Sequence, residues 1–358
     1  MRVAVIGGGV MGAATSWRLT KRGADVVCFD RFSPPHANGS SHGESRIIRT
    51  AYIEGSYYVP LLHESFDLWH ELESTSGERL LRMTGALYIG SPTSEAIAGA
   101  QGSAEEHGLD IEVLSGKELQ KRYRAHVARE DVAILDKKAG ILNPEGAVAA
   151  MLAQVPEVRR ETPVNSVDEL LGDFDKVVIA AGPWTPELLD WLPLKIERQV
   201  HTWFAIARDA DWFSPDRCPV FIRETEDFGY FFGFPTLDGV TVKMGRHHDG
   251  DYTDPEHIQR RVDDADLDPL RLIASTYLRG VSGHVRRTVT CMYTNTPDHD
   301  FVIDFSPRDD RVVILSPCSG HGFKFAPIVG DIAADLVCDG GTKRDISHFS
   351  ASRFAPSA

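Results

Sequence analysis

The chain has 358 residues, a formal net charge of −14, 42% hydrophobic residues and 25% charged residues. This composition is typical of a soluble globular protein that is large enough for two domains. The negative charge argues against nucleic acid or an anionic membrane as a partner, and no stretch holds the roughly 18 apolar residues of a transmembrane helix.

The first thirty residues predict a strand, a helix and a second strand. Residues 2–6 form an apolar run typical of a strand buried on both faces. Residues 11–20 have helical spacing, and residues 26–29 form a second apolar run. This order is the βαβ opening of an α/β fold.

The rest of the chain continues with helices and buried strands and then changes pattern. Helices are predicted at 57–76, 93–108, 116–123, 146–154 and 325–337, and buried strands at 85–89, 111–114, 177–181 and 312–315. Between 197 and 284 the strands alternate and are rich in aromatic residues, which indicates an antiparallel sheet. The polar segment 32–50 is too long for a simple connection.

Three glycines around the start of the first helix read G-x-G-x-x-G. Gly7 permits a tight turn, Gly9 lets a pyrophosphate approach the backbone, and Gly12 lets helix and strand pack closely. The free N–H groups of the helix N-terminus favour phosphate, and Asp30 can accept hydrogen bonds from a ribose. The predicted dinucleotide contacts are Gly7, Gly9, Val10, Met11, Gly12, Asp30 and Arg31. Both FAD and NAD use this cradle, although a start at residue 7 favours FAD; the alternative is a glycine-rich loop that binds nothing.

Two segments carry residues whose roles stay open when each segment is taken alone. Arg46 and Arg49, three residues apart, would share one face if their segment is a helix, or they form a solvated basic patch. Cys291 lies among strand-forming residues and next to the turn at 294–297. It is either an inert core residue or partly exposed.

The segment 319–325 reads S-G-H-G-F-K-F between a buried strand and a helix. The glycines beside His321 let the backbone approach a ligand closely. The N-terminus of the following helix can stabilise negative charge. Lys324 is then either an anion clamp or a solvated lysine.

The cysteines and the N-terminus indicate a cellular compartment. The five cysteines are scattered without a C-x-x-C pair, which argues against a disulfide framework and a zinc knuckle. The apolar start is too rich in glycine for a signal peptide. We therefore expect a cytoplasmic protein without a metal site.

Three sequence blocks together resemble one family. The blocks P-P-H-x-N-G-S-x-H-G-[DE]-[ST]-R-I-I-R, C-M-Y-T and S-G-H-G-F-K-F are similar to those of monomeric sarcosine oxidase and N-methyltryptophan oxidase, within the D-amino-acid-oxidase-like flavoproteins. The resemblance runs from Gly7 to 345–347. It implies an α/β fold in which a Rossmann-type FAD-binding domain is interleaved with an antiparallel-sheet substrate domain. The expected FAD-binding domain comprises 1–83, 146–196 and 285–358, and the expected substrate domain comprises 84–145 and 197–284.

The resemblance also implies how FAD is held. Cys291 would form a thioether to the 8α-methyl group of FAD, which requires a thiolate at that edge of the ring. His42 and Arg46 would stabilise the charge that develops during this attachment. The other residues implied to contact FAD are Gly320, His321, Gly322 and Lys324.

The implied catalytic residues surround a small amine. Arg49 and Lys324 would bind the substrate carboxylate, the first through its planar guanidinium and the second through its ammonium group. Lys243 would lie near flavin N5 and promote the reaction with oxygen. Tyr293 would lie near the carboxylate. His247 matches an active-site histidine, for which its neighbour His248 could be mistaken, and Arg46 completes the implied catalytic set.

The implied activity is oxidation of the C–N bond of a secondary or N-methyl amino acid. Oxygen is the acceptor, the products are an imine, which hydrolyses to an aldehyde, and hydrogen peroxide, and the protein acts as a monomer. Phe232 stands where sarcosine-specific members have a tyrosine, and one residue is inserted before that strand. The altered pocket wall, with Arg223 or Glu224 expected near it, makes a cyclic or bulkier secondary amino acid an equal alternative. The alternatives of another class are an NAD-dependent dehydrogenase and a non-catalytic flavin-binding protein.

Overall fold

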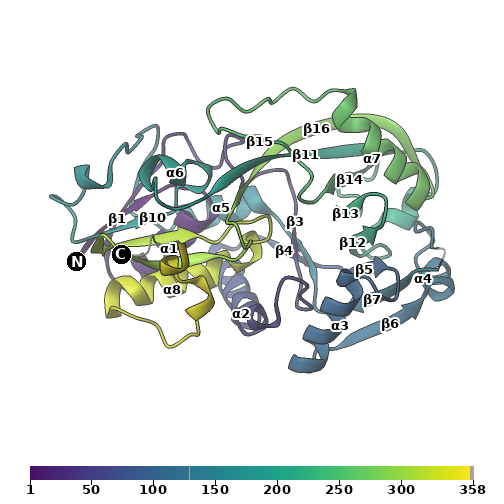
Figure 1. Ribbon diagram of the computed structural model, residues 1–358, viewed down its shortest axis with the longest axis horizontal. Coiled ribbons are helices and arrows are strands. Elements are labelled where there is room, and N and C mark those ends of the chain that lie inside the picture. The colour runs from purple at the N-terminus through teal and green to yellow at the C-terminus, as the bar shows by residue number, and fades with distance from the viewer. Residues whose placement is uncertain (129, 355–358) are drawn as a thin grey trace.

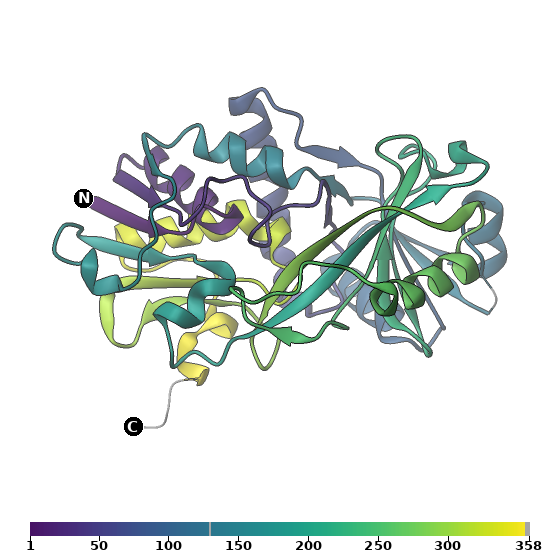
Figure 2. The same ribbon diagram turned by 90° about the horizontal axis from the view of Figure 1, so that it is seen from above.

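The computed structural model describes residues 1–128 and 130–354. Two large sheets lie at opposite ends of the molecule, and two long strands, β11 and β16, arch between these ends (Figure 1). The view from above shows the same two strands running diagonally across the molecule (Figure 2). The structure is therefore the mixed α/β fold that the sequence predicts.

The first sheet has six strands in the order β17-β18-β10-β1-β2-β9, all parallel except β17. Its strands are β1 (Arg2–Ile6), β2 (Asp25–Phe29), β9 (Glu157–Arg159), β10 (Lys176–Ile179), β17 (Val302–Ser306) and β18 (Asp309–Ser316). Along β1, Val3 and Val5 pack into one core and Ala4 and Ile6 into another. This strand is buried on both faces, as its apolar run predicts.

Helices cover one face of this sheet, and the segment 164–194 covers the other. The helices at this end are α1 (Val10–Lys21), α2 (Val59–Ser76), α5 (Pro144–Leu152), α6 (Thr185–Leu188) and α8 (Ala326–Asp339). Helix α5 begins at Pro144 and not at 146 because the side chain of Asn143 accepts a 3.0 Å hydrogen bond from Gly146 N.

The second sheet has nine strands in the order β15-β11-β14-β13-β12-β5-β7-β6, with β16 paired to β11. Its strands are β5 (Ala86–Gly90), β6 (Ile111–Ser115), β7 (Val132–Asp136), β11 (Lys195–Ile206), β12 (Val220–Thr225), β13 (Gly229–Gly233), β14 (Thr241–Arg246), β15 (Tyr252–Thr253) and β16 (Val281–Asn295). The strands are antiparallel, as expected, except that β12 pairs with β5 in parallel.

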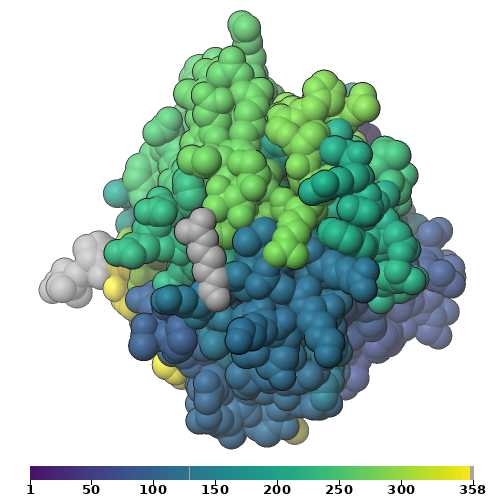
Figure 3. Space-filling model, turned by 90° about the vertical axis from the view of Figure 1, so that its right-hand side faces the viewer, coloured from purple at the N-terminus to yellow at the C-terminus, as the bar shows by residue number. Residues whose placement is uncertain are grey.

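Three helices accompany the second sheet: α3 (Glu95–His107), α4 (Gly116–Arg122) and α7 (Asp264–Tyr277). The sequence analysis predicts no helix near α7, whose capping box joins Asp263 and Asp266 and whose second turn contains Pro269. Seen from this end, the blue segment that includes α3 and α4 lies against the green segment that includes α7 (Figure 3). An isolated bridge between His126 and Leu278 joins the two segments.

A small sheet of β3 (Arg46–Ile48), β8 (Gly140–Leu142) and β4 (Leu81–Met83) completes the described elements. The segment with Arg46 and Arg49 is therefore a strand and not a helix. Since side chains alternate along a strand, two residues three apart do not share a face. The five cysteines are free thiols, as their spacing predicts.

No helix within 1–128 and 130–354 combines the length and the apolar composition of a membrane span. The assignment of residues to two discontinuous domains stays a prediction.

Candidate functional site

A cavity of about 670 Å³ is lined by residues of both large sheets and their loops. It brings together nearly all of the residues that the sequence singles out. The predicted residues on its wall are Gly7, Gly9, Val10, Met11, Asp30, Arg31, Arg46, Arg49, Lys243, His247, Cys291, Tyr293, Gly320, His321, Gly322 and Lys324. Gly12 and His42 are not among the residues that line the cavity.

At one end, the glycine loop between β1 and α1 has no room for side chains. Gly7 has φ +104°, and a Cβ there would lie 2.3 Å from the carbonyl oxygen of Ala180. A Cβ on Gly12 would lie 1.7 Å from the carbonyl oxygen of Gly7. Gly9 supplies no side-chain cap to α1, although Val10 N donates to Ser41 Oγ at 3.0 Å, so the other N–H groups at the start of this helix can receive a phosphate.

A Gly12→Ala variant is therefore expected to lose affinity for a dinucleotide. The added methyl group must push the loop away from α1, which destabilises the fold by at least the ~1–3 kcal/mol of an overpacked core. Gly102→Ala, in the interior of α3 with nothing within 4 Å of the new Cβ, is the control. It should stabilise the protein by roughly 0.5–1 kcal/mol. Thermal unfolding measures the stability of each variant, and FAD content measures its dinucleotide binding. A Gly12→Ala protein that binds FAD normally would contradict the role of this glycine loop in binding a dinucleotide.

Asp30 holds the glycine loop as well as facing the cavity. Its Oδ2 accepts a 2.6 Å hydrogen bond from Gly8 N, and its Oδ1 accepts one of 2.7 Å from Phe32 N. A carboxylate has about four lone-pair positions, so acceptors remain for a ribose. Arg31 instead pairs with Glu187 and Glu256 at the edge of the cavity.

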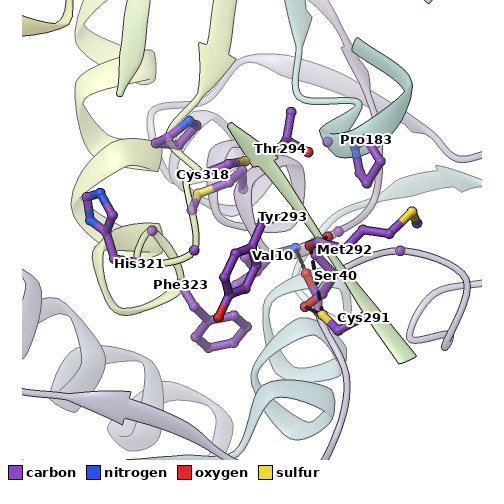
Figure 4. Close-up of a pocket in the computed structure, with 18 of the residues that line it drawn as sticks. Val10, Ser40, Pro183, Cys291, Met292, Tyr293, Thr294, Cys318, His321 and Phe323 are labelled. Carbon is purple, nitrogen blue, oxygen red and sulfur yellow. Dashed lines mark hydrogen bonds between the residues drawn. The ribbon is translucent and has the colours of Figure 1, made fainter. Parts of the chain in front are cut away.

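In the middle of the cavity, Cys291 on β16 lies beside the segment that carries Ser40 (Figure 4). Its Sγ is 3.6 Å from Nη2 of Arg46, and the same nitrogen donates a 2.7 Å hydrogen bond to the carbonyl oxygen of Ser40. Of the two alternatives for Cys291, the buried one holds: the residue is 2% exposed, although it lines the cavity.

His42 lies behind this pair and is also buried. Burial, followed by the charge of Arg46, lowers the pKa of His42 to about 4. At neutral pH His42 is therefore uncharged, and Arg46 supplies the positive charge beside Cys291.

Lys243 on β14 donates to three oxygens of the loop before β3. Its Nζ is 2.7 Å from Gly43 O, 3.0 Å from Ser45 O and 3.1 Å from Ser45 Oγ. Burial, and then the charge of Arg46, lowers the pKa of Lys243 well below its usual value. The two carbonyl oxygens accept from this nitrogen, whereas the Ser45 hydroxyl can either accept from it or donate to it, so these contacts fit both the ammonium and the neutral amine.

At the other end, Arg49 and Lys324 flank the ring of Tyr52. The Arg49 guanidinium lies 4.2 Å, and Lys324 Nζ 5.1 Å, from the centre of this ring. Nη2 of Arg49 already binds both carboxylate oxygens of Glu54, at 2.5 and 2.7 Å. Lys324 donates to the carbonyl oxygen of His321 at 2.5 Å. Burial, and then Arg49, lowers the pKa of Lys324 well below its usual value.

This pairing changes the ionisation of Glu54. Burial would raise the pKa of Glu54, but Arg49, His321 and Lys324 together outweigh it and hold the pKa far below its usual value. Any carboxylate ligand must therefore share Arg49 with Glu54 or displace Glu54 from Arg49.

His247 and Tyr293 form a hydrogen-bonded pair on the same wall, with 3.1 Å between Nδ1 and the phenol oxygen. Gly320, at φ +79°, leaves them room, because a Cβ there would lie 2.8 Å from His247 and 2.7 Å from Tyr293. Burial lowers the pKa of His247 well below its usual value, so its ring stays neutral. His321 bonds Tyr52 at 2.7 Å through Nδ1.

The expectation that Arg223 or Glu224 lies near the pocket wall holds for Glu224 and not for Arg223. Ile222 lines the cavity, whereas the next residue on β12, Arg223, points to the opposite side and pairs with Asp131. Glu224 shares the face of Ile222 and accepts a 2.7 Å hydrogen bond from Ala96 N at the start of α3. Burial, and then the charge of Glu224, raises the pKa of Tyr230, which lines the cavity.

Several residues of the cavity escape the sequence analysis. Glu54 neutralises Arg49 from a loop, where no spacing rule predicts a contact. His201 lines the cavity, and neither of its ring nitrogens has a hydrogen-bond partner within the described residues. Glu197 lies four residues earlier on β11, and the alternation of that strand could have placed both on one face.

Comparisons with known proteins agree with this arrangement. Residues 2–336 match a family model described as FAD dependent oxidoreductase. The chain is 37% identical over 374 residues to the monomeric sarcosine oxidase of Streptomyces avermitilis, covering 99% of this chain and 97% of that protein. It is 32% identical over 368 residues to an N-methyl-L-tryptophan oxidase of Yersinia pestis, covering 98% of each.

A solved structure has the same fold. NikD, an unusual amino acid oxidase essential for nikkomycin biosynthesis, matches with a TM-score of 0.83 and 25% identity. The match covers 97% of this chain and 96% of that chain.

Proposed function

Since the chain belongs to the FAD dependent oxidoreductase family, we propose that it oxidises the C–N bond of a secondary or N-methyl amino acid with oxygen. The products are an imine, which water hydrolyses to an aldehyde, and hydrogen peroxide. One observation carries the proposal: a single cavity holds the nucleotide cradle, the Cys291–Arg46 pair, Lys243 and the Arg49–Lys324 end. A dehydrogenase that uses NAD has no need of the Cys291–Arg46 pair or of Lys243.

The residues present fit FAD. The glycines leave the backbone bare where a pyrophosphate would bind, Asp30 retains acceptors for a ribose, and the cavity continues past Cys291. FAD, when bound, supplies the redox chemistry by taking two electrons from the amine and passing them to oxygen. We propose that Cys291 holds it covalently, with Arg46 stabilising the thiolate.

The chain's own residues bind and orient the substrate. Arg49 and Lys324 supply the positive charges for a carboxylate, with Glu54 as the resident competitor. Lys243 supplies a fixed ammonium in the middle of the cavity. We also propose that the chain acts as a monomer and that it acts in the cytoplasm, where thiols stay reduced.

Changing Glu54 to Gln should tighten the binding of small carboxylates roughly tenfold or more, since a hydrogen bond to a charged group contributes about 1.5–3 kcal/mol. Arg49→Ala should weaken it by roughly 2–5 kcal/mol. Glu95→Gln is the control, because Glu95 also lines the cavity but makes no contact with Arg49. Titration of the FAD-loaded protein, followed by visible absorbance, gives the affinities. Equal affinities in all four proteins, or a wild type that prefers uncharged amines, would refute this assignment.

The large side chains on one wall favour a second candidate substrate class. Ile222, Phe232 and Phe234 line the cavity together with Tyr230, which suits a cyclic or bulkier secondary amino acid better than sarcosine. A screen of N-methyl and cyclic secondary amino acids for peroxide formation tests both classes. If every secondary amine fails and another donor class succeeds, the proposed function is wrong.

A further inference from the structure

A buried carboxylate holds one histidine of the cavity in place. Glu197 on β11 is 3% exposed, and its Oε2 lies 3.1 Å from Nδ1 of His248 and 2.6 Å from Nδ2 of Asn295. Its Oε1 accepts from Gly250 N at 2.9 Å and from Gln199 Nε2 at 2.5 Å. Burial would raise the pKa of Glu197, but the hydrogen bonds from His248, Gly250 and Asn295 lower it, so Glu197 stays ionised.

This contact fixes which nitrogen of His248 carries a proton. An ionised carboxylate only accepts, so Nδ1 of His248 donates to it and Nε2 keeps a lone pair in the neutral ring. Nε2 has no hydrogen-bond partner in the part of the chain that the structure describes. His248 lines the cavity, and its side chain is 27% exposed, so a proton on Nε2 can pass to solvent.

The other titratable groups around His248 are less suited to accept a proton. The ring centres of His247, which follows β14, and His299, in the loop before β17, lie 4.2 and 4.5 Å from that of His248, and burial lowers the pKa of both. Burial raises the pKa of Tyr293, whose ring on β16 is 5.3 Å away. Asp249, the next residue, pairs with Arg246.

The proposed amine oxidation creates a need for such a group. An aliphatic amine has a pKa of about 10, so only about one molecule in a thousand is neutral at pH 7. The ammonium has no lone pair on nitrogen, and oxidation at its C–N bond would place a second positive charge next to the first. A substrate that enters as an ammonium must therefore lose a proton inside the cavity.

We propose that His248 is a catalytic residue that accepts this proton, and that Glu197 is its positioning residue. One N–H bond of the ammonium breaks, one N–H bond forms at Nε2, and no electrons are transferred. The proton then leaves to water through the exposed edge of the ring. Glu197 orients the ring and stabilises the imidazolium while it exists. The inference rests on the proposed amine oxidation.

The test is the pH dependence of kcat/KM for His248→Asn. Asparagine tolerates the left-handed backbone at this position, φ +54°, and can donate to Glu197, but it cannot accept the proton. Only amine that is already neutral then reacts. We expect kcat/KM near pH 7 to fall at least tenfold, to rise about tenfold per pH unit, and to approach wild type near pH 10, the ordinary pKa of the amine. Small carboxylates without an amine should bind unchanged.

His299→Asn is the matched control, because His299 also lines the cavity at a positive φ but has no carboxylate partner within the described residues. It should keep the wild-type profile. Glu197→Gln removes the negative charge that stabilises the imidazolium. Because the base acts in its neutral form, the acid limb of the profile should move to lower pH. A purely structural role would lower kcat/KM at every pH without moving the limb.

A His248→Asn enzyme with the wild-type pH profile would overturn the proposal while leaving amine oxidation intact. If His248→Asn does not fold, an unmoved acid limb in Glu197→Gln overturns it instead. A wild type that oxidises no secondary amine at any pH would contradict the proposed function itself, which separates the two failures.

Discussion

Replacing Cys291 with alanine is expected to abolish the covalent attachment of FAD. The sulfur lies on the cavity wall with a guanidinium nitrogen of Arg46 at 3.6 Å, which favours the thiolate that the bond requires. After denaturation, flavin fluorescence should travel with the wild-type polypeptide and be absent from the variant. Only one sulfur atom is lost, so Cys291→Ala should still fold and bind FAD reversibly through the glycine cradle.

Cys318→Ala is the matched control for this prediction. Cys318 is the other thiol on the cavity wall, and burial raises its pKa to about 11, so it is a thiol at neutral pH. This variant should retain covalent flavin. Release of all flavin from denatured wild type, or covalent flavin in Cys291→Ala, would contradict the assignment.

Replacing Lys243 with methionine is expected to slow the reaction with oxygen by orders of magnitude. The first electron transferred to oxygen creates superoxide, a new anion in the cavity. A fixed ammonium stabilises this anion far more than it stabilises neutral oxygen, so it lowers that barrier selectively. The three oxygens within 3.1 Å of Nζ hold Lys243 in one place.

Amine oxidation creates no new anion near Lys243, so the rate of that half-reaction should change much less in Lys243→Met. Anaerobic reduction by substrate should stay within about tenfold of wild type, roughly 1.4 kcal/mol. Stopped-flow absorbance separates the two half-reactions, and Lys195→Met, at the exposed start of β11, is the control. If oxygen reoxidises the flavin of Lys243→Met as fast as that of the wild type, Lys243 does not promote the reaction with oxygen.

Local patterns predicted the elements of this fold well. The apolar run 2–6, the glycines and the helical spacing after them are short-range signals, and each corresponds to an observed element. Helix α7 was missed because four aspartates between 263 and 268 are typical of a polar loop, while its apolar residues face the second core. The short strand at Arg46 was missed because its partner β8 lies about a hundred residues away.

The candidate site was also predicted only in part from the sequence. Motifs predicted which residues line the cavity, because a motif preserves residue type and spacing. They did not predict the partners, such as Glu54 on Arg49 or Glu197 on His248, because these contacts arise from loops and strand pairing. Arg223 shows the converse: a position one residue from the wall points away from it, since strand side chains alternate.

The most direct test of the account is to mix the FAD-loaded protein with an N-methyl or cyclic secondary amino acid without oxygen, and then to admit oxygen. We predict that the yellow absorbance of the protein bleaches in the first step and returns in the second, with one hydrogen peroxide formed per amine oxidised. A protein that purifies without flavin, or a flavin that no secondary amine bleaches, would contradict the account.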